Sequence, residues 1–441
     1  MTKIIRFFVA LLLFPGVILL TPIPATVTAV AADPSANDRG SFPAPIVKLG
    51  ASYAVVVDKS QQQLHVFHHN GRGMELIFTA PCSTGMNGGS KEAAGDGKTP
   101  EGIYFATDRF SERELSATYG ALAFNLNYPN FVDSRKGRTG CNIWIHGTDT
   151  DLSPFQSNGC VVLADGNIRR LAEFIELNKT PVIILNRVQW VSGDAALMAR
   201  RELTALVDRW LEQFRAGHID ELASMYENRT LVDDESLKKI VEKIEDWKSR
   251  GIEASFNIEN VSILKHEGHA AVIFDQVVSY RDRSWSCGHR VLFLGRNGKD
   301  WIISGDVLQH PSSADQLGEQ LAIMDAMISI YADVSDMIER WRVSWQSGDM
   351  RQYASFYARD FRSNGMDRAG WIAYKKRIGS KNKNITITIG DLEITPGSKR
   401  SRVSFHQLYQ SSIHSDEGIK TLYLKKDDGR WKICRETWKA S

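Results

Sequence analysis

The sequence predicts a multi-domain protein in which a mostly-β domain is followed by two α+β domains. Its 441 residues suit two to four domains. Residues 46–188 form short runs that alternate polar and apolar side chains with a period of two, which is typical of strands. The remainder contains an internal repeat, because residues 203–226 match residues 334–357 without a gap. Each copy runs from helices into three or four strands, the order of helices packed on one face of an antiparallel sheet.

The N-terminus has the composition of a secretory signal peptide. Lys3 and Arg6 precede an apolar run at 7–20, and the small-residue stretch TAVAAD follows. We expect residues 1–32 to be a signal peptide and residues 33–45 a Pro/Ser/Gly linker. The mature protein is then periplasmic or secreted, with an uncleaved anchor as the alternative. The formal net charge of +2 gives no reason to expect nucleic acid as a partner.

We expect the first domain to cover residues 46–190 and to contain several strands and one helix. Two runs around the polar turn at 59–62 predict a hairpin. CNIWIHG predicts a short strand with Trp144 and His146 on one face. Asp165 is the expected N-cap of a helix over 165–179. The remaining expected strands are MELIFTAP, a strand from Ile103, and the buried strand PVIIL.

The repeat predicts two α+β domains, at 197–310 and 333–441, joined by a connecting helix at 311–332. Trp210 aligns with Trp341 and Tyr226 with Tyr357, and the tryptophans at helical spacing favour core packing. No acid or base recurs at equivalent positions. The repeats are therefore expected to bind or position a partner rather than to catalyse a reaction.

A histidine and a cysteine in the first domain are candidates for nucleophilic catalysis. His146 stands fourteen residues before Cys160, which follows Ser157, Asn158 and Gly159. Cysteine attacks as a thiolate and needs a base or a positive environment to form it. A glycine before the cysteine allows a tight turn in which backbone N–H groups converge. The alternative is a core cysteine, since free cysteines are among the most buried residues.

Two polar, glycine-rich segments precede this pair. Residues 83–102 contain six glycines together with Lys91, and NYPNFVDSRKGRTG (127–140) contains Tyr128 and Arg138. Long polar loops inside a compact domain are usually functional. The segments therefore favour the catalytic interpretation of Cys160.

Taken in order, STG…GDGKTPEGIY, NYPN…GRTG…IHG and SNGCVVL resemble the L,D-transpeptidase (YkuD-type) catalytic domain of bacterial cell-wall enzymes. The match is nearest the YafK-like branch and covers about residues 50–188. The resemblance implies a β-sandwich-like core, peptidoglycan stem peptides as substrate, and no cofactor or metal. It implies that Cys160 is the nucleophile, that His146 is its base, and that the Gly147 carbonyl orients the imidazole. The implied oxyanion hole is formed by the N–H groups of Gly159 and Cys160, and the implied substrate contacts are Ser157, Asn158, Arg138, Tyr128 and Lys91.

Two positions depart from the family pattern. The usual motif has a basic residue or histidine where Asn158 stands, and often an arginine where Val162 stands. These departures leave the acyl acceptor open between an amine, as in a transpeptidase, and water, as in an L,D-carboxypeptidase.

The two repeats resemble NTF2-like (SnoaL-like) cone-shaped domains. One such domain follows this catalytic domain in some helical-shape-determining L,D-carboxypeptidases, which implies a role in cell shape. The cone pockets are candidates for binding a wall-linked protein or peptide. A third function, a non-catalytic wall-binding scaffold, is disfavoured because both His146 and Cys160 are present.

The other cysteines and the histidine clusters have simpler interpretations. We expect Cys82 and Cys141 to pack in or beside strands, with a disulfide between them as the alternative. His65, His68 and His69, like His266 and His269, are weak candidates for metal binding.

Overall fold

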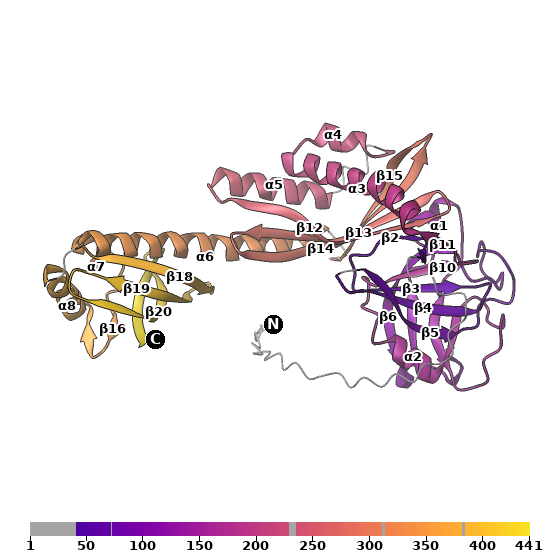
Figure 1. Ribbon diagram of the computed structural model, residues 1–441, viewed down its shortest axis with the longest axis horizontal. Coiled ribbons are helices and arrows are strands. Elements are labelled where there is room, and N and C mark those ends of the chain that lie inside the picture. Colours follow the sequence, from indigo (N-terminus) through magenta and orange to yellow (C-terminus); the bar gives the residue numbers. More distant parts are fainter. Residues whose placement is uncertain (1–40, 72, 229–234, 311–313, 382–383) are drawn as a thin grey trace, which may run out of the picture. The chain divides into compact units, whose positions relative to one another are not determined.

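Figure 1 shows a computed structural model of the protein, which describes residues 41–71, 73–228, 235–310, 314–381 and 384–441. The predicted signal peptide and residues 33–40 of the predicted linker lie outside these ranges. Among the described helices, none combines the length and hydropathy that a membrane span requires.

The first domain is built on an eight-stranded sheet of order β5-β4-β3-β10-β6-β7-β8-β9. Its pairs are antiparallel except β3–β10 and β8–β9, and the prediction of a mostly-β domain is confirmed. The predicted hairpin is β3–β4, and MELIFTAP and PVIIL are strands as expected. The strands are β3 (Tyr53–Asp58), β4 (Gln63–His69), β5 (Met74–Pro81), β6 (Gly102–Ser111), β7 (Leu122–Leu126), β8 (Trp144–Thr148), β9 (Val161–Ala164) and β10 (Pro181–Leu185).

Two short helices accompany this sheet, α1 (Phe131–Arg135) and α2 (Asp165–Leu171). The prediction that Asp165 caps α2 is wrong, because Ala164 is the N-cap residue and Asp165 is the first helical residue. Its carboxylate instead accepts a hydrogen bond from the Ala121 N–H at 2.9 Å. The helix also ends at Leu171, well before the predicted Lys179. Two 3-10 turns complete the domain, at Glu112–Glu114 and Ala117–Tyr119.

The central strands of this sheet are buried on both faces. Val55 and Val57 of β3 belong to a core that includes α2, whereas Ala54 and Val56 face the opposite way. That second face packs against the sheet of the first α+β domain through one shared apolar cluster. Such two-sided burial explains why the strand PVIIL is apolar at every position.

The first α+β domain recruits a strand from the N-terminal side of the first domain. Its sheet has the order β15-β14-β13-β12-β2, and β2 (Ile46–Lys48) pairs antiparallel with β12. Residues 46–48, which the sequence assigned to the first domain, therefore complete the next sheet. Two further short strands, β1 (Ser41–Pro43) and β11 (Trp190–Ser192), belong to neither of these two sheets. The domain's own elements are α3 (Gly193–Ala216), α4 (Ile219–Ser224), α5 (Glu235–Ser249), β12 (Ala254–His266), β13 (His269–Tyr280), β14 (Arg283–Asn297) and β15 (Asp300–His310).

The second α+β domain repeats this order around a four-stranded sheet, β18-β19-β20-β21. Its first helix, α6, is continuous from Ala314 to Ser347, so the predicted connecting helix at 311–332 is not a separate element within the described residues. The linker and the first helix of the repeat are one helix because no helix-breaking residue separates them. The remaining elements are α7 (Met350–Ser355), β16 (Arg362–Ser363), β17 (Met366–Asp367), α8 (Arg368–Lys381), β18 (Thr386–Thr395), β19 (Arg400–Gln410), β20 (Ser415–Asp427) and β21 (Arg430–Ala440).

Each α+β domain encloses the same buried polar chain. In the first domain, Trp210 Nε1 donates to the Tyr226 hydroxyl at 2.9 Å, which donates to Asp306 at 2.8 Å. A buried ion pair joins Asp306 to Arg290. The tryptophans are fully buried, as predicted.

The second domain has the corresponding chain. Trp341 Nε1 donates to Tyr357 at 3.1 Å, and Tyr357 donates to Glu436 at 2.9 Å. Glu436 pairs with Lys420 at 2.9 Å. The expectation that no acid or base recurs is therefore wrong. The equivalent residues lie on the paired strands, beyond the gapless match, and differ in type between the copies.

We predict that Gly305→Ala destabilises the contact between the first domain and the first α+β domain. A Cβ at Gly305 would lie 2.3 Å from the ring of Phe131, which stacks on Phe293 with centroids 5.3 Å apart. Overpacking of this kind costs about 1–3 kcal/mol, so we expect a lower denaturation midpoint. Gly295→Ala on the neighbouring strand is the control, because its Cβ would meet nothing closer than 3.7 Å. Equal midpoints for the two variants would contradict the packing argument.

Candidate active site

The parallel pair β8–β9 brings His146 and Cys160 to the same region of the sheet. Ile145 pairs with Val161 and His146 with Val162, and Cys160 immediately precedes β9. Cys160 therefore lies diagonally across from His146, two positions back along the ladder and on the same face. Diagonal neighbours have Cα atoms about 7–8 Å apart, within reach of long side chains.

The His146 ring is oriented by the backbone. Its Nδ1 lies 2.8 Å from the carbonyl oxygen of Gly147. A carbonyl can only accept, so Nδ1 carries the proton and Nε2 keeps its lone pair when the ring is neutral. Burial lowers the pKa of His146, and the hydrogen bond to Gly147 opposes that shift. The ring is thus a neutral base near pH 7.

Glycine at 147 allows the chain to pack closely beneath the histidine. A Cβ at this position would lie 2.3 Å from Asp165 Oδ1 and 2.9 Å from Ile168 Cγ2. The start of α2 therefore packs directly against the backbone that orients the imidazole.

An aromatic group that the sequence analysis did not single out covers the histidine. The Tyr119 ring meets His146 edge-on at 5.0 Å and Trp144 at 4.8 Å. Phe110 stacks on Trp144 at 5.1 Å. Only the alternation of β8, which puts Trp144 on the His146 face, gave a sequence signal for this group.

The Cys160 thiol is partly buried and protonated at rest. Its Sγ donates to the Asn142 carbonyl at 3.8 Å. Burial raises the pKa of Cys160, while a backbone hydrogen bond from Trp144 and the positive charge of Lys91 lower it. Within the described ranges, no hydrogen bond joins this thiol to the His146 ring.

The turn before Cys160 is fixed by Ser157. Its hydroxyl donates to the Cys160 carbonyl at 2.6 Å and accepts from the Gly159 N–H at 3.1 Å. This N–H, one of the two predicted oxyanion donors, is therefore already engaged. Asn158 is exposed, and Val162 is half-buried.

Lys91 belongs to the framework of the glycine-rich loop. Its ammonium, buried in this loop, lies 2.8 Å from Asp96 and 3.0 Å from the Ala93 carbonyl. Backbone N–H groups of the loop also donate to Asp96. These hydrogen bonds and the Lys91 ammonium hold the pKa of the Asp96 carboxyl well below its usual range, against the effect of burial. A second buried lysine, Lys59, donates to Glu101 and to the Gly89 and Thr99 carbonyls.

Tyr128 and Arg138 fix the segment at 127–140. Arg138 pairs with the buried Asp133 at 2.8 Å. The Tyr128 hydroxyl donates to the carbonyls of Thr139 and Lys91, at 3.2 and 3.4 Å, and so connects the two loops. Lys91, Tyr128 and Arg138 thus all make internal contacts that hold these two segments.

The remaining cysteines differ from one another. Cys82 is buried as predicted, and burial raises the pKa of its thiol to about 12. The expectation that Cys141 is core is wrong, because it is exposed in the loop before β8. All five cysteines are free thiols, so no disulfide joins Cys82 to Cys141. In the described parts of the chain, no three His, Cys, Asp or Glu side chains group as metal ligands.

We predict that Gly159→Ala disrupts the turn before the thiol. Gly159 has a φ of +126°, and a Cβ there would lie 2.7 Å from the Lys98 carbonyl oxygen. Strain of this kind costs about 1–3 kcal/mol, so the denaturation midpoint and the reactivity of Cys160 should both fall. Gly166→Ala, at an open position in α2, should leave both unchanged or raise the midpoint slightly. A reactive, fully stable Gly159→Ala variant would contradict this account.

We predict that the Tyr119 ring keeps the pKa of His146 below its ordinary value of about 6.5. Tyr119→Ala should let water reach the imidazole and raise its pKa, so the acid limb of any His146-dependent reaction moves to higher pH. Tyr119→Phe keeps the ring and should not move it. Proton NMR titration of the His146 ring measures both shifts; identical pKa values in the two variants would rule out burial by Tyr119.

Comparisons with known proteins bear on both ends of the chain. Residues 52–184 match the model of the L,D-transpeptidase catalytic domain (YkuD), and residues 333–437 match that of the Cds6 C-terminal NTF2-like domain. The comparison with curated proteins found no match.

Among solved structures, Bd1075 of Bdellovibrio bacteriovorus is 24% identical over 91% of this chain and 99% of its own, with a TM-score of 0.33. The helical cell shape determining protein Pgp2 of Campylobacter jejuni is 19% identical over 90% and 94%, with a TM-score of 0.30. The family models thus identify a YkuD-type domain over residues 52–184 and an NTF2-like domain over residues 333–437.

Proposed function

We propose that the protein is a cysteine enzyme that acts on peptidoglycan stem peptides through a thioester on Cys160. The observation that supports this most directly is the β8–β9 register. It puts Cys160 and a tautomer-fixed His146 on one face of the sheet, within a domain of the YkuD family. We propose domain limits of 46–190, 197–310 and 333–441, with two corrections: β2 pairs with β12, and α6 joins the predicted connecting segment to the last domain.

In the acylation step, His146 Nε2 takes the proton from the Cys160 thiol as the sulfur attacks the peptide carbonyl on the L-centre of a stem diamino acid. A C–S bond forms and the carbonyl oxygen takes the electron pair. When the intermediate collapses, the C–N bond breaks and the imidazolium gives its proton to the departing D-amino acid. The products are a thioester and a free amino acid.

The resting electrostatics suit proton transfer during the attack rather than a preformed ion pair. Burial raises the pKa of Cys160 and lowers that of His146, so both groups are neutral at rest. The charge of Lys91 favours the thiolate when it forms. Because the Gly159 N–H is bonded to Ser157, we assign the oxyanion to the Cys160 N–H, and one such donor is worth about 2.7–4 kcal/mol.

One observation favours water as the acyl acceptor, which would make the enzyme an L,D-carboxypeptidase. The side chains of Asn158 and Val162 carry no charge, and Lys91, whose charge acts on Cys160, is paired with Asp96. Neither position 158 nor position 162 therefore supplies a charged group to hold an acceptor peptide. A small neutral acceptor needs no such anchor.

The remaining parts of the proposal concern location and partners. The N-terminal sequence pattern supports a periplasmic or secreted enzyme, where peptidoglycan is accessible. The two α+β domains, which enclose buried polar chains rather than an open catalytic group, are proposed to bind or position a wall-linked protein or peptide.

We predict that Cys160→Ala abolishes activity on tetrapeptide muropeptides and covalent labelling by a carbapenem, as measured by mass spectrometry. Cys141→Ala is the matched control: this thiol is exposed but belongs to the loop before β8 rather than to the turn at Cys160, so activity and labelling should persist. A wild-type protein that is folded but gains no Cys160-dependent mass would favour the non-catalytic scaffold. In the digest, a tripeptide product means that water is the acceptor, whereas 3–3 dimers mean that an amine is.

A further inference from the structure

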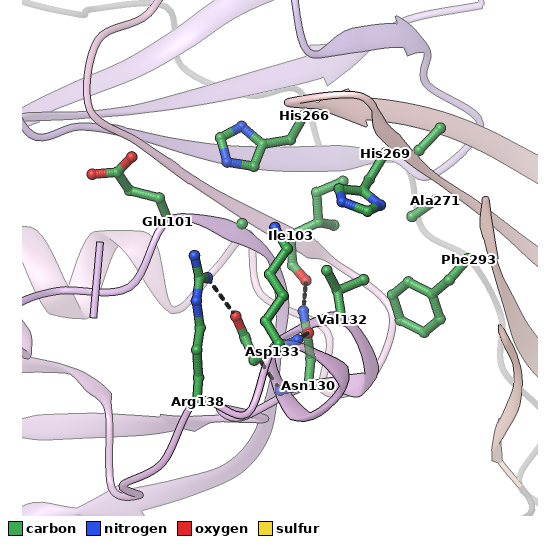
Figure 2. Close-up of a pocket in the computed structure, with 13 residues that line it drawn as sticks. Glu101, Ile103, Asn130, Val132, Asp133, Arg138, His266, His269, Ala271 and Phe293 are labelled. Atoms are coloured by element: carbon green, nitrogen blue, oxygen red, sulfur yellow. Dashed lines mark hydrogen bonds and ion pairs between the residues drawn. The ribbon is translucent and has the colours of Figure 1, made fainter. Parts of the chain in front are cut away.

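A small cavity lies between the first domain and the β12–β13 hairpin of the first α+β domain (Figure 2), and Cys160 is not among the residues that line it. Its volume is about 30 Å³. One water-sized group needs about 10–15 Å³ measured this way, so the cavity accommodates two or three such groups. The polar side chains that line it are Glu101, Asn130, Asp133, Lys136, Arg138, His266 and His269.

The two acids of the cavity are already compensated. Asp133 accepts from Arg138 at 2.8 Å, from the Tyr104 hydroxyl at 3.0 Å and from the Asn130 N–H at 3.2 Å. Glu101 pairs with the buried ammonium of Lys59 at 2.8 Å. Neither carboxylate therefore needs a further cation from the cavity.

The basic groups are less well matched. Within the described residues, Lys136 forms no ion pair, and its chain position just after α1 puts it at the rim of the cavity. His266 and His269 form a cross-strand pair at the end of the hairpin; in Figure 2 the His269 ring points toward Val132, and the His266 ring points toward the side of Glu101. The nearest acid to His266 is Glu267, at 3.8 Å and 61% exposed.

Neighbouring positive charges disfavour protonation of both imidazoles. Burial lowers the pKa of His269, and the charges of Lys136, His266 and Arg135 lower it further while Glu267 opposes them. Burial likewise lowers the pKa of His266; Lys136 and Arg138 add to this shift, whereas Glu267 and Glu101 oppose it. A negative group among them would relieve the repulsion.

We propose that this cavity is a binding site for a single carboxylate group, with Lys136, His266 and His269 as its cationic partners. A carboxylate has three heavy atoms and fits the volume, whereas a phosphate has five and does not. The source is either the C-terminal carboxylate of a peptide or a free small carboxylate. Binding takes up protons, because the bound charge favours the imidazolium forms, so affinity falls as pH rises through the histidine pKa values.

This inference is independent of the thioester chemistry, because none of the three residues contacts Cys160. Its test is a titration of the full chain with sodium acetate at constant ionic strength, followed by NMR of the histidine rings. We expect saturable shifts and a raised pKa for His266 and His269, with no change for His68 on β4. Cys160→Ala should bind acetate like the wild type, which separates this test from the test of catalysis.

Lys136→Ala should weaken acetate binding at least about tenfold, the effect of one lost charge-assisted hydrogen bond. The side chain is exposed, so the variant is expected to fold. Lys399→Ala, which removes an exposed lysine from the second α+β domain, should have no effect. An acetylated tripeptide that binds more tightly than acetate, and loses the gain when its C-terminus is amidated, would identify a peptide as the source.

Three results would overturn the proposal. One is the absence of any saturable change in His266 and His269 on the acid side of their pKa values. Another is equal binding of inorganic phosphate, which would exclude a site shaped for a carboxylate. The third is an equal loss in the Lys136→Ala and Lys399→Ala variants, which would show that the effect is one of overall charge.

Discussion

The arrangement of the whole catalytic domain depends on the burial of its central strands from both sides. An antiparallel sheet can keep one face in water, but here that face packs on the sheet of the first α+β domain through residues such as Val56, Ile183 and Phe293. The two domains therefore share one core. Helix α1 lies at this junction: Phe131 stacks on Phe293, and Arg135 pairs with Glu227. The position of the loop that follows α1 therefore depends on contacts with both domains.

In the glycine-rich segments, charged side chains stabilise the loop backbone rather than point freely into solvent. Lys59, Lys91 and Arg138 each neutralise an acid at short range and fix a glycine-rich segment. Such partly buried pairs add little net stability, but removal of one partner is costly because the other charge is left unpaired. Their chemistry resembles that of substrate ligands, so residue type and motif position alone could not separate the two roles. Lys91 does both in one respect, since its field also favours the thiolate.

The strands could be predicted because they rest on period-two alternation, which is a local signal, whereas the pairing of His146 with Cys160 as base and nucleophile rests on motif order and stays a prediction. Alternation states which face a residue occupies but not which strand lies beside it, so the pairing of β2 with β12 was missed. The hydrogen-bonded polar groups of the two α+β domains were missed for two reasons. Arg290 corresponds to Lys420 and Asp306 to Glu436, so the residue types differ between the copies. These residues also lie far along the sequence from the aligned tyrosines that contact the two acids. The Tyr119 cover and the exposure of Cys141 follow from tertiary packing that no short pattern encodes.

The parallel direction of β8 and β9 has a consequence for how such an enzyme can change its specificity. Parallel neighbours cannot be joined by a tight turn, so the chain must travel through residues 149–160 before it re-enters the sheet. That excursion passes the Cys160 thiol, while the ladder from Ile145–Val161 onward keeps His146 and Cys160 in register. Insertions or substitutions within 149–156 would therefore reshape the entrance to the site without altering the distance between its two reacting groups. Residues 149–156 can thus vary in sequence and length, while the β8–β9 ladder keeps the relative position of His146 and Cys160.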